Sequence, residues 1–192
     1  MEIKNKEGKV IFTVEGNSLV NANLRNADLR YADLRGAYLR NAKLWYADLR
    51  DADLQNANLR DADLRNANLQ YADLQYADLQ DADLQYADLQ YANLQYADLQ
   101  YADLQDADLQ YADLRNAKLQ GADLRDADLD FSCFPLWCGS FKMKANVKFA
   151  AQLAYHFCRI DFGTNKEAKE AQKYLKTLAN KFHRVDECGK IE

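Results

Sequence analysis

Leucine recurs at every fifth position along most of the chain, from Leu19 to Leu129, 23 times without an exception. From Ala22 to Ala127 an alanine stands two residues before each leucine, so the unit reads mostly A-[D/N]-L-x-x. This spacing fits no regular element. On an α-helix the leucines would spiral around the cylinder, and on a flat strand alternate leucines would face opposite sides. The chain must therefore bend within every unit.

The alanine and the leucine of one unit lie two residues apart and share a side, as in a very short strand. The next alanine comes three residues later, which leaves room for a corner. A chain that turns at each pentapeptide keeps every alanine and leucine inside. One such turn cannot bury its own leucines, so stability must come from stacking the turns. The pattern predicts a β-helix with short straight sides and a filled interior.

The unit, as in Ala72-Asp73-Leu74-Gln75-Tyr76, resembles the repeat of the pentapeptide-repeat family. The resemblance covers residues 16–135 and implies an all-β solenoid, a right-handed quadrilateral β-helix with four units to a coil. In that fold the leucine and the small residue before it point inward. Carried onto this chain, 24 units from Leu19 to Phe134 give about six coils, roughly 29 Å long at the usual strand spacing.

The two ends are expected to cover the open coils, because exposed strand edges invite aggregation. Residues 1–15 are predicted to hold an N-terminal capping strand, since Val10–Val14 alternates in polarity as a strand does. After Pro135 the hydrophobic period changes to that of a helix. Residues 136–192 are therefore predicted to form a two-helix C-terminal cap.

The second of these helices is expected to begin at Thr164, which with Glu167 has the spacing of a capping box. Its apolar side carries Tyr174, Leu178 and Phe182. These three residues are candidate contacts of a homodimer, since related proteins often dimerise through their C-terminal ends. Packing against the first helix of the same chain is the alternative.

Residues 20 positions apart should lie in one column on the outside of the solenoid. One column contains Tyr31, Asp51, Tyr71, Tyr91, Tyr111 and Phe131. Its rings are predicted to stack and stabilise the fold, and a partner-binding strip is the alternative. A second column, Arg25, Trp45 and Arg65, predicts an indole between two guanidinium groups.

The formal net charge of −5 is unevenly distributed, because residues 66–114 hold ten aspartates and no lysine or arginine. From Gln70 to Gln110 the residue after each leucine is glutamine, which leaves the acid uncompensated. Arginine holds that position in several outer units. The candidate partner surface is Asp63, Asp83, Asp103 and Asp123 on one face, Asp88, Asp108 and Asp128 on another, Asp78 and Asp98 on a third, with Tyr71, Tyr91 and Tyr111.

Two interpretations of this acidic surface remain open. In the first, aspartate and glutamine are the outward residues that the family prefers, and the protein is a scaffold. In the second, the surface mimics DNA, as in family members that protect against quinolones by presenting an acidic rod to DNA gyrase. Residues 16–135 carry 21 acidic and 11 basic side chains. Spread over the expected length of roughly 29 Å, the excess of acidic side chains amounts to about one net charge per 3 Å. Duplex DNA carries about one charge per 1.7 Å. Direct binding of nucleic acid is not expected of so acidic a surface.

The units of residues 71–115 are nearly identical, whereas the flanking units vary. Consensus repeats are unusually designable, so this pattern favours engineered consensus units placed between natural ends. Recent duplication is the alternative. In the engineered case no biological partner was selected for the central face.

No motif of an enzyme is present: the chain lacks a glycine-rich phosphate loop, H-E-x-x-H and G-x-S-x-G. We therefore expect no catalytic residues, cofactor or metal. Cys133, Cys138, Cys158 and Cys188 lack a short C-x₂-C knuckle, which favours reduced thiols over zinc or a Cys158–Cys188 disulfide. No apolar run approaches the roughly 20 residues of a membrane span, and the N-terminus does not resemble a signal peptide. A cytoplasmic protein is expected.

Overall fold

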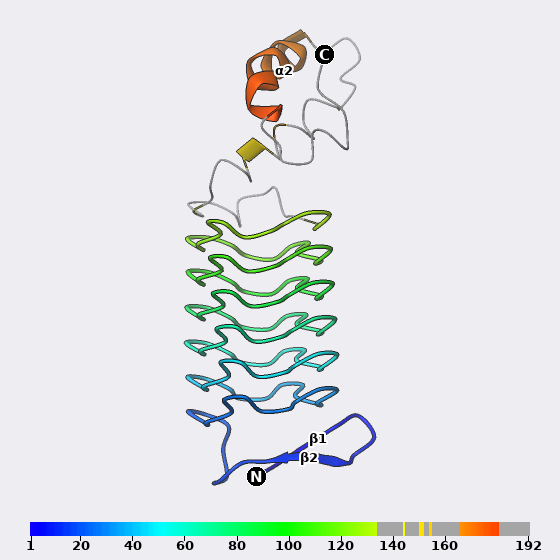
Figure 1. The fold of residues 1–192 in the computed structure, drawn as a ribbon, viewed down its shortest axis with the longest axis vertical. Coiled ribbons are helices and arrows are strands. Elements are labelled where there is room, and N and C mark those ends of the chain that lie inside the picture. The colour runs from blue at the N-terminus through cyan, green and yellow to red at the C-terminus, as the bar shows by residue number, and fades with distance from the viewer. Residues whose placement is uncertain (134–143, 145–149, 152–153, 155–165, 181–192) are drawn as a thin grey trace. The chain divides into compact units, whose positions relative to one another are not determined.

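The computed structural model describes residues 1–133, 144, 150–151, 154 and 166–180. The chain divides into two compact units, Met1–Lys144 and Ala145–Glu192. The first unit holds strands β1 (Glu2–Lys4) and β2 (Val10–Thr13), followed by a stack of coils, and the second holds helix α2 (Lys166–Ala179) (Figure 1).

The coils are held together by a parallel ladder in which each rung joins residues 20 positions apart. The rungs run from Asn23 paired with Lys43 to Asp113 paired with Cys133. Four pentapeptides therefore make one coil, and the predicted β-helix is confirmed. One further rung joins Asp123 to Lys144, so the ladder includes a residue beyond the expected boundary at 135.

Backbone hydrogen bonding explains why each unit needs its residue types. The aspartate N–H donates to the preceding coil. The N–H groups of the leucine and of the corner residue, which is the one before the next alanine, donate to the following coil. The alanine N–H donates to the carbonyl of the preceding leucine and closes a turn. The N–H of the residue after the leucine donates to the aspartate side chain of the same unit. Around Leu84, for example, the N–H groups of Asp83, Leu84 and Tyr86 donate to the carbonyl groups of Ala62, Asp103 and Gln105, at 2.9, 2.7 and 3.0 Å respectively. The Ala82 N–H donates to the Leu79 carbonyl at 3.1 Å, and the Gln85 N–H donates to Asp83 Oδ1 at 3.2 Å.

The interior is filled by the repeated aliphatic residues. All 23 leucines are buried, with at most 4% of their surface exposed, and 20 of the 22 alanines are buried. Burial of each leucine is worth about 1.5–3 kcal/mol. Alanine suits the second inward position because a larger side chain would overpack so narrow a space. The inward direction predicted for both residues is confirmed.

Each corner is a single residue in the left-handed helical conformation, a feature that the sequence analysis did not predict. The residue before every alanine has a φ between 54° and 62° in all non-glycine cases, and Gly36 and Gly121 take the same place. Asparagine and aspartate tolerate this conformation, whereas it costs other residues about 1–2 kcal/mol. Each of the nine tyrosines at corners therefore carries this backbone cost.

The N-terminal segment is a hairpin rather than a single strand. β1 and β2 pair antiparallel, with Ile3 opposite Phe12. Beyond the end of β1, Asn5 bridges to Ala32, and the Asp33 N–H donates to the Lys4 carbonyl at 2.8 Å. Lys4 and Asn5, which bond to the first coil, therefore lie before β2, the strand that the alternating sequence predicted.

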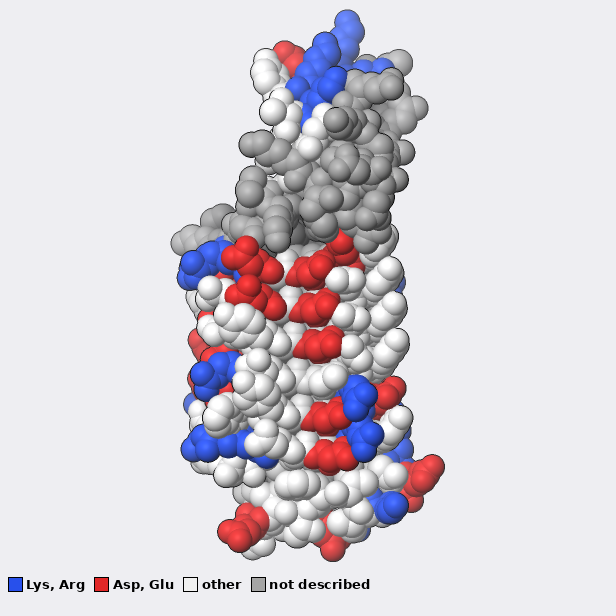
Figure 2. Space-filling model, in the orientation of Figure 1, with Lys and Arg blue, Asp and Glu red and all other residues white. Residues whose placement is uncertain are grey.

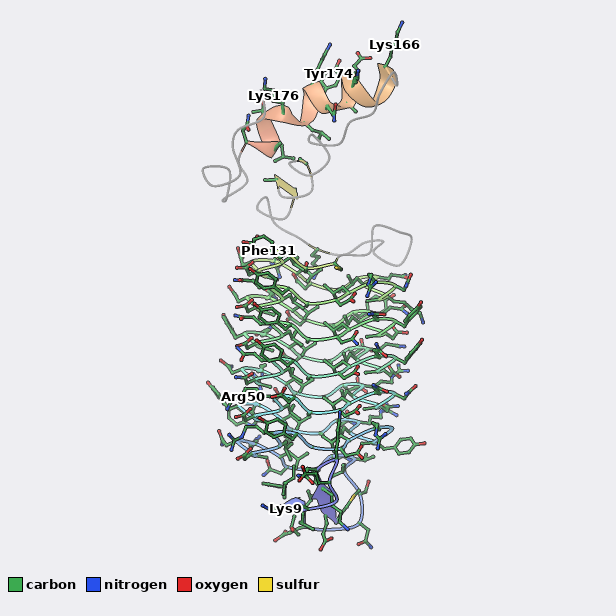
Figure 3. All side chains as sticks on the ribbon, turned by 90° about the vertical axis from the view of Figure 1, so that its right-hand side faces the viewer. Lys9, Arg50, Phe131, Lys166, Tyr174 and Lys176 are labelled. Atoms are coloured by element: carbon green, nitrogen blue, oxygen red, sulfur yellow. The ribbon has the colours of Figure 1, made fainter. Side chains whose placement is uncertain are left out.

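In the second unit, α2 covers most of the second helix expected from the sequence. Leu175 and Leu178 pack against a buried cluster of Ala151, Ala154 and Ala179. Tyr174 was expected on the apolar side but is 78% exposed (Figure 3). Ala150, Ala151 and Ala154 are helical and belong to the first expected helix. The remainder of that helix, Thr164 and Phe182 lie outside the described residues.

Candidate functional site

The outer surface of the coils is the candidate site, because leucine and alanine side chains fill the inside. The same side chains recur from coil to coil (Figure 3). We call the rows of aspartates the acidic columns. The ladder places Asp63, Asp83, Asp103 and Asp123 in one of them, Asp88, Asp108 and Asp128 in a second, and Asp78 and Asp98 in a third. Figure 2 shows a vertical row of acidic side chains on one face, with basic side chains beside its lower part.

The aspartates of the acidic columns have a structural role that the sequence analysis missed. Their Oδ1 atoms accept a hydrogen bond from the backbone N–H two residues later, for example at 3.0 Å between Gln110 and Asp108. Asparagine does the same at Asn68, where the distance is 3.1 Å. The side chains are consequently half-buried, and Asp123 is buried at 6% exposure. The sequence did hold a signal for this role, because the position before each leucine is mostly restricted to aspartate and asparagine, two residues whose side chains can accept this hydrogen bond.

The central aspartates are not as isolated as their charge suggested. A glutamine amide of one coil donates to the carboxylate of the next coil, 18 residues later. The distances are 2.6 Å from Gln70 to Asp88 and 3.0 Å from Gln80 to Asp98. Glutamine therefore links successive coils without neutralising the acid. Basic side chains also reach three of these carboxylates: Arg60 lies 3.9 Å from Asp78, Arg65 lies 3.4 Å from Asp83, and Lys118 lies 2.9 Å from Asp98. At these three the expectation of uncompensated acid is wrong.

In the outer coils arginine takes the place of glutamine. Its guanidinium group donates two hydrogen bonds, as a fork, to the carboxylate of the aspartate in its own unit. Arg65 donates to Asp63 from Nε and Nη2, both at 2.8 Å. This hydrogen bond holds the pKa of Asp63 below its ordinary value. The next member of the column, Asp83, has no such fork, and desolvation raises the pKa of its carboxyl group. One column therefore joins a stabilised and a destabilised carboxylate.

The rings of the tyrosine column stack as predicted from Tyr71 to Phe131. Successive ring centroids of Tyr71, Tyr91, Tyr111 and Phe131 lie 4.9, 4.7 and 4.8 Å apart, with interplanar angles of 1° to 10°. A second stack, Tyr76 on Tyr96 at 4.9 Å, was not predicted. Such pairs contribute about 0.5–1.5 kcal/mol each, which offsets the cost of the corner conformation at the five tyrosines that stack.

The predicted arrangement around Trp45 is confirmed. The guanidinium carbon of Arg25 lies 4.7 Å from the indole centroid, and that of Arg65 lies at 5.9 Å. Both distances are within the range of a cation–π interaction. The surface thus already holds planar cations against an aromatic ring.

The described residues contain no group of three side chains that could hold a metal ion. Cys133 is a free, exposed thiol, and the other three cysteines lie outside these residues. Nor does any helix within the described part of the chain have the length and apolarity of a membrane span.

The chain belongs to the pentapeptide-repeat family: the model of pentapeptide repeats matches it in eight copies, over residues 15–45, 47–85, 87–126 and 107–134. Members of this family fold as right-handed β-helices. No curated protein matches the chain.

Three solved structures illustrate the similarity. HetL, a pentapeptide repeat protein involved in heterocyst differentiation regulation from the cyanobacterium Nostoc sp. strain PCC 7120, is 34% identical over 67% of this chain and 65% of its own, just under two thirds, with a TM-score of 0.40. The pentapeptide repeat protein alr5209 from Nostoc PCC 7120 is 39% identical over 52% and 84%, with a TM-score of 0.42. QnrB1, a plasmid-mediated fluoroquinolone resistance protein, is 21% identical over 82% and 78%, with a TM-score of 0.44.

Proposed function

We propose that the protein is a non-enzymatic scaffold whose outer columns present side chains to a protein partner. The filled interior carries this proposal, because an enzyme needs a pocket and the leucines occupy the space inside the coils. We further propose a solenoid of about six coils over residues 16–135, with residues 1–15 and the two helices of 136–192 as its caps. A homodimer through α2 and a cytoplasmic location remain predictions, and light scattering tests the first.

The hydrogen bonds support a structural reason for the aspartates. Asparagine serves equally as the acceptor for the backbone N–H, yet aspartate is more frequent in the central coils. Each glutamine amide that reaches the next coil donates to an aspartate, and a carboxylate is a stronger acceptor than an amide. The choice of aspartate over asparagine thus has an explanation within the fold.

Coil deletion tests the scaffold proposal. Removing residues 76–95 takes out one complete coil and joins units of the same pattern. The shortened protein is expected to keep the far-ultraviolet circular dichroism of a β-helix and to melt at a lower temperature, because stability in stacked repeats sums over neighbouring coils. Tolerance of this change also suits engineered consensus units with no selected partner. Loss of the folded spectrum would show that the coils are not interchangeable.

Mimicry of DNA is the second candidate, favoured by the run of ten aspartates without a basic residue in 66–114. It predicts inhibition or protection of DNA gyrase, or of another DNA-binding protein, at micromolar concentration. Replacing Asp78, Asp88, Asp98 and Asp108 together by asparagine removes charge but retains the backbone acceptor. A supercoiling assay should show inhibition by the parent and none by this variant. A parent protein without effect at tens of micromolar would exclude gyrase as the target.

A further inference from the structure

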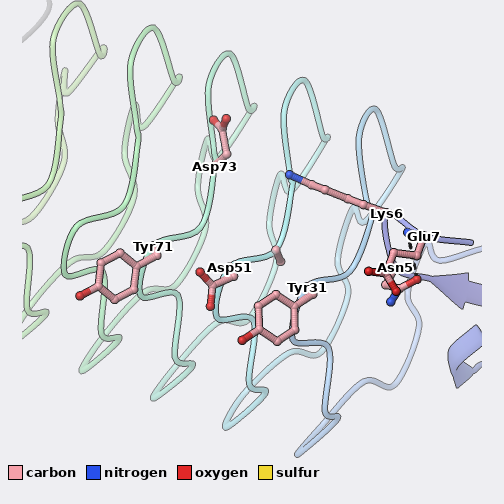
Figure 4. A pocket seen from close by; sticks show the side chains of 8 residues that line it. Asn5, Lys6, Glu7, Tyr31, Asp51, Tyr71 and Asp73 are labelled. Atoms are coloured by element: carbon pink, nitrogen blue, oxygen red, sulfur yellow. Dashed lines mark hydrogen bonds between the residues drawn. The ribbon is translucent and has the colours of Figure 1, made fainter. Parts of the chain in front are cut away.

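The tyrosine column is interrupted at one place, where Asp51 stands between Tyr31 and Tyr71. An open hollow of about 740 Å³ lies at this interruption. Figure 4 shows the two rings pointing to the same side, with the Asp51 carboxylate between them. We call this place the Asp51 slot.

The dimensions of the Asp51 slot follow from the complete part of the column. Rings one coil apart lie 4.7–4.9 Å apart and are nearly parallel. With one ring absent, the strand spacing puts the Tyr31 and Tyr71 rings about 9.6 Å apart. A group midway lies about 4.8 Å from both, inside the roughly 6 Å limit of a cation–π interaction. Since stacked rings already touch, the space between the two rings beyond the Asp51 carboxylate is one planar group thick.

The electrostatics of the Asp51 slot favour a cation. Among the described residues no side chain pairs with the exposed Asp51 carboxylate. Glu7 and Asp73 add two further acidic groups to the lining. Lys6 is the basic residue of the lining, and its Nζ is already paired with Asp53 at 3.2 Å. Arg30 and Arg50 interact electrostatically with the Tyr31 hydroxyl group. Their guanidinium groups are already paired, with Asp28 at 2.7 Å and with Asp48 at 2.6 Å. The Asp51 carboxylate therefore has no ionic partner of its own between the two rings.

We propose that the Asp51 slot binds the guanidinium group of an arginine side chain from a protein partner. A guanidinium is flat enough to lie between the Tyr31 and Tyr71 rings while donating to Asp51, whereas the rounded ammonium of lysine has no face to stack. The same surface carries the inverse arrangement, in which Arg25 and Arg65 lie on either side of Trp45. This inference rests on the proposed scaffold function only in that the arginine belongs to a protein.

A second interrupted column provides an internal comparison. Asn66 stands between Tyr46 and Tyr86, one coil from each, in the same corner conformation as Asp51. The neutral amide offers no charge to a cation. We therefore expect the Asn66 position to bind arginine more weakly than the Asp51 slot.

The test is titration with the capped peptide acetyl-Gly-Arg-Gly-amide, followed by nuclear magnetic resonance of the Tyr31 and Tyr71 ring protons. We expect saturable shifts with a dissociation constant of about 1 mM, and at least about tenfold weaker binding of the lysine and citrulline peptides. Asp51→Asn should weaken binding about tenfold. Asp51→Tyr should abolish it, because a tyrosine ring fills the space between the other two rings. A cooperative thermal transition shows that this variant is folded.

Asp81→Asn is the matched control, since Asp81 occupies the same corner conformation but has Asp61 on one side and Tyr101 on the other. It loses the same charge and should bind the arginine peptide as the parent does. Equal binding of the citrulline peptide, or of the arginine peptide by Asp51→Tyr, would overturn the proposal. So would the absence of shifts at 20 mM peptide, about twenty times the expected constant. Because short peptides are the probe, these outcomes are independent of the gyrase and coil-deletion tests.

Discussion

Replacing Tyr91 by asparagine isolates the contribution of ring stacking to this fold. Tyr91 has a stacked ring on both sides, at 4.9 Å and 4.7 Å. Two pairs at about 0.5–1.5 kcal/mol each amount to about 1–3 kcal/mol. The matched control is Tyr86→Asn, since Tyr86 has Asn66 and Asp106 as column neighbours and no stacked ring among the described residues. Both tyrosines have a φ near 58°, so asparagine relieves the same backbone cost at each.

We expect Tyr86→Asn to leave stability unchanged or to raise it, and Tyr91→Asn to be less stable than Tyr86→Asn by about 1–3 kcal/mol. Urea denaturation followed by far-ultraviolet circular dichroism measures this difference. Midpoints and slopes are both compared, because long repeat arrays can depart from two-state unfolding. Equal midpoints for the two variants would refute the view that the rings stabilise the corners.

Three further changes test the packing, a corner and the charges. Leu84→Ala should cost about 2–5 kcal/mol in urea denaturation, because the leucine is 1% exposed and its removal leaves a cavity. Gly121→Ala should lower the melting temperature more than Gly36→Ala: both have positive φ, but a β-carbon at Gly121 would lie 2.6 Å from a tyrosine ring, whereas Gly36 faces open space. At pH 7, Asp83→Asn should raise the melting temperature, because desolvation raises the pKa of this carboxyl and penalises its ionised form. Asp63→Asn should lower it, because the Arg65 fork lowers the pKa and stabilises the ionised form. The Asp83 effect should disappear by pH 3, below the raised pKa of this carboxyl, and its persistence there would contradict the electrostatic cause. The Asp63 effect should begin to shrink only below the ordinary pKa of 3.8 and should be lost at the lowered pKa.

The two interpretations of the acidic surface now differ in what they must explain. The hydrogen bonds account for aspartate at the position before leucine, where it caps a backbone N–H and receives the glutamine amide. They do not account for Asp81 and Asp106, which stand at exposed corners. Aspartate tolerates the left-handed conformation of a corner, so the backbone geometry explains its presence there. The fold therefore gives a reason for aspartate at both positions, and the gyrase assay decides whether a partner uses them.

The repeated spacing alone determined the β-helix, its filled interior and its columns. Leucine at every fifth position and alanine two residues earlier leave a coiled backbone as the way to bury both. Column membership follows by counting 20 residues, and the Tyr71 stack and the Arg25–Trp45 contact were predictable for that reason.

The tertiary structure decided what each outward side chain does. The pattern could not show that the corner residue is left-handed, because tyrosine, asparagine and aspartate at that position suggested only exposure. Nor could it show that Asp83 caps the backbone, that Gln70 reaches Asp88, or that β1 supplies the bonds to the first coil. These depend on distances between adjacent coils. The Asp51 slot likewise exists because two rings, 40 residues apart in sequence, are held two coil spacings apart by the backbone ladder.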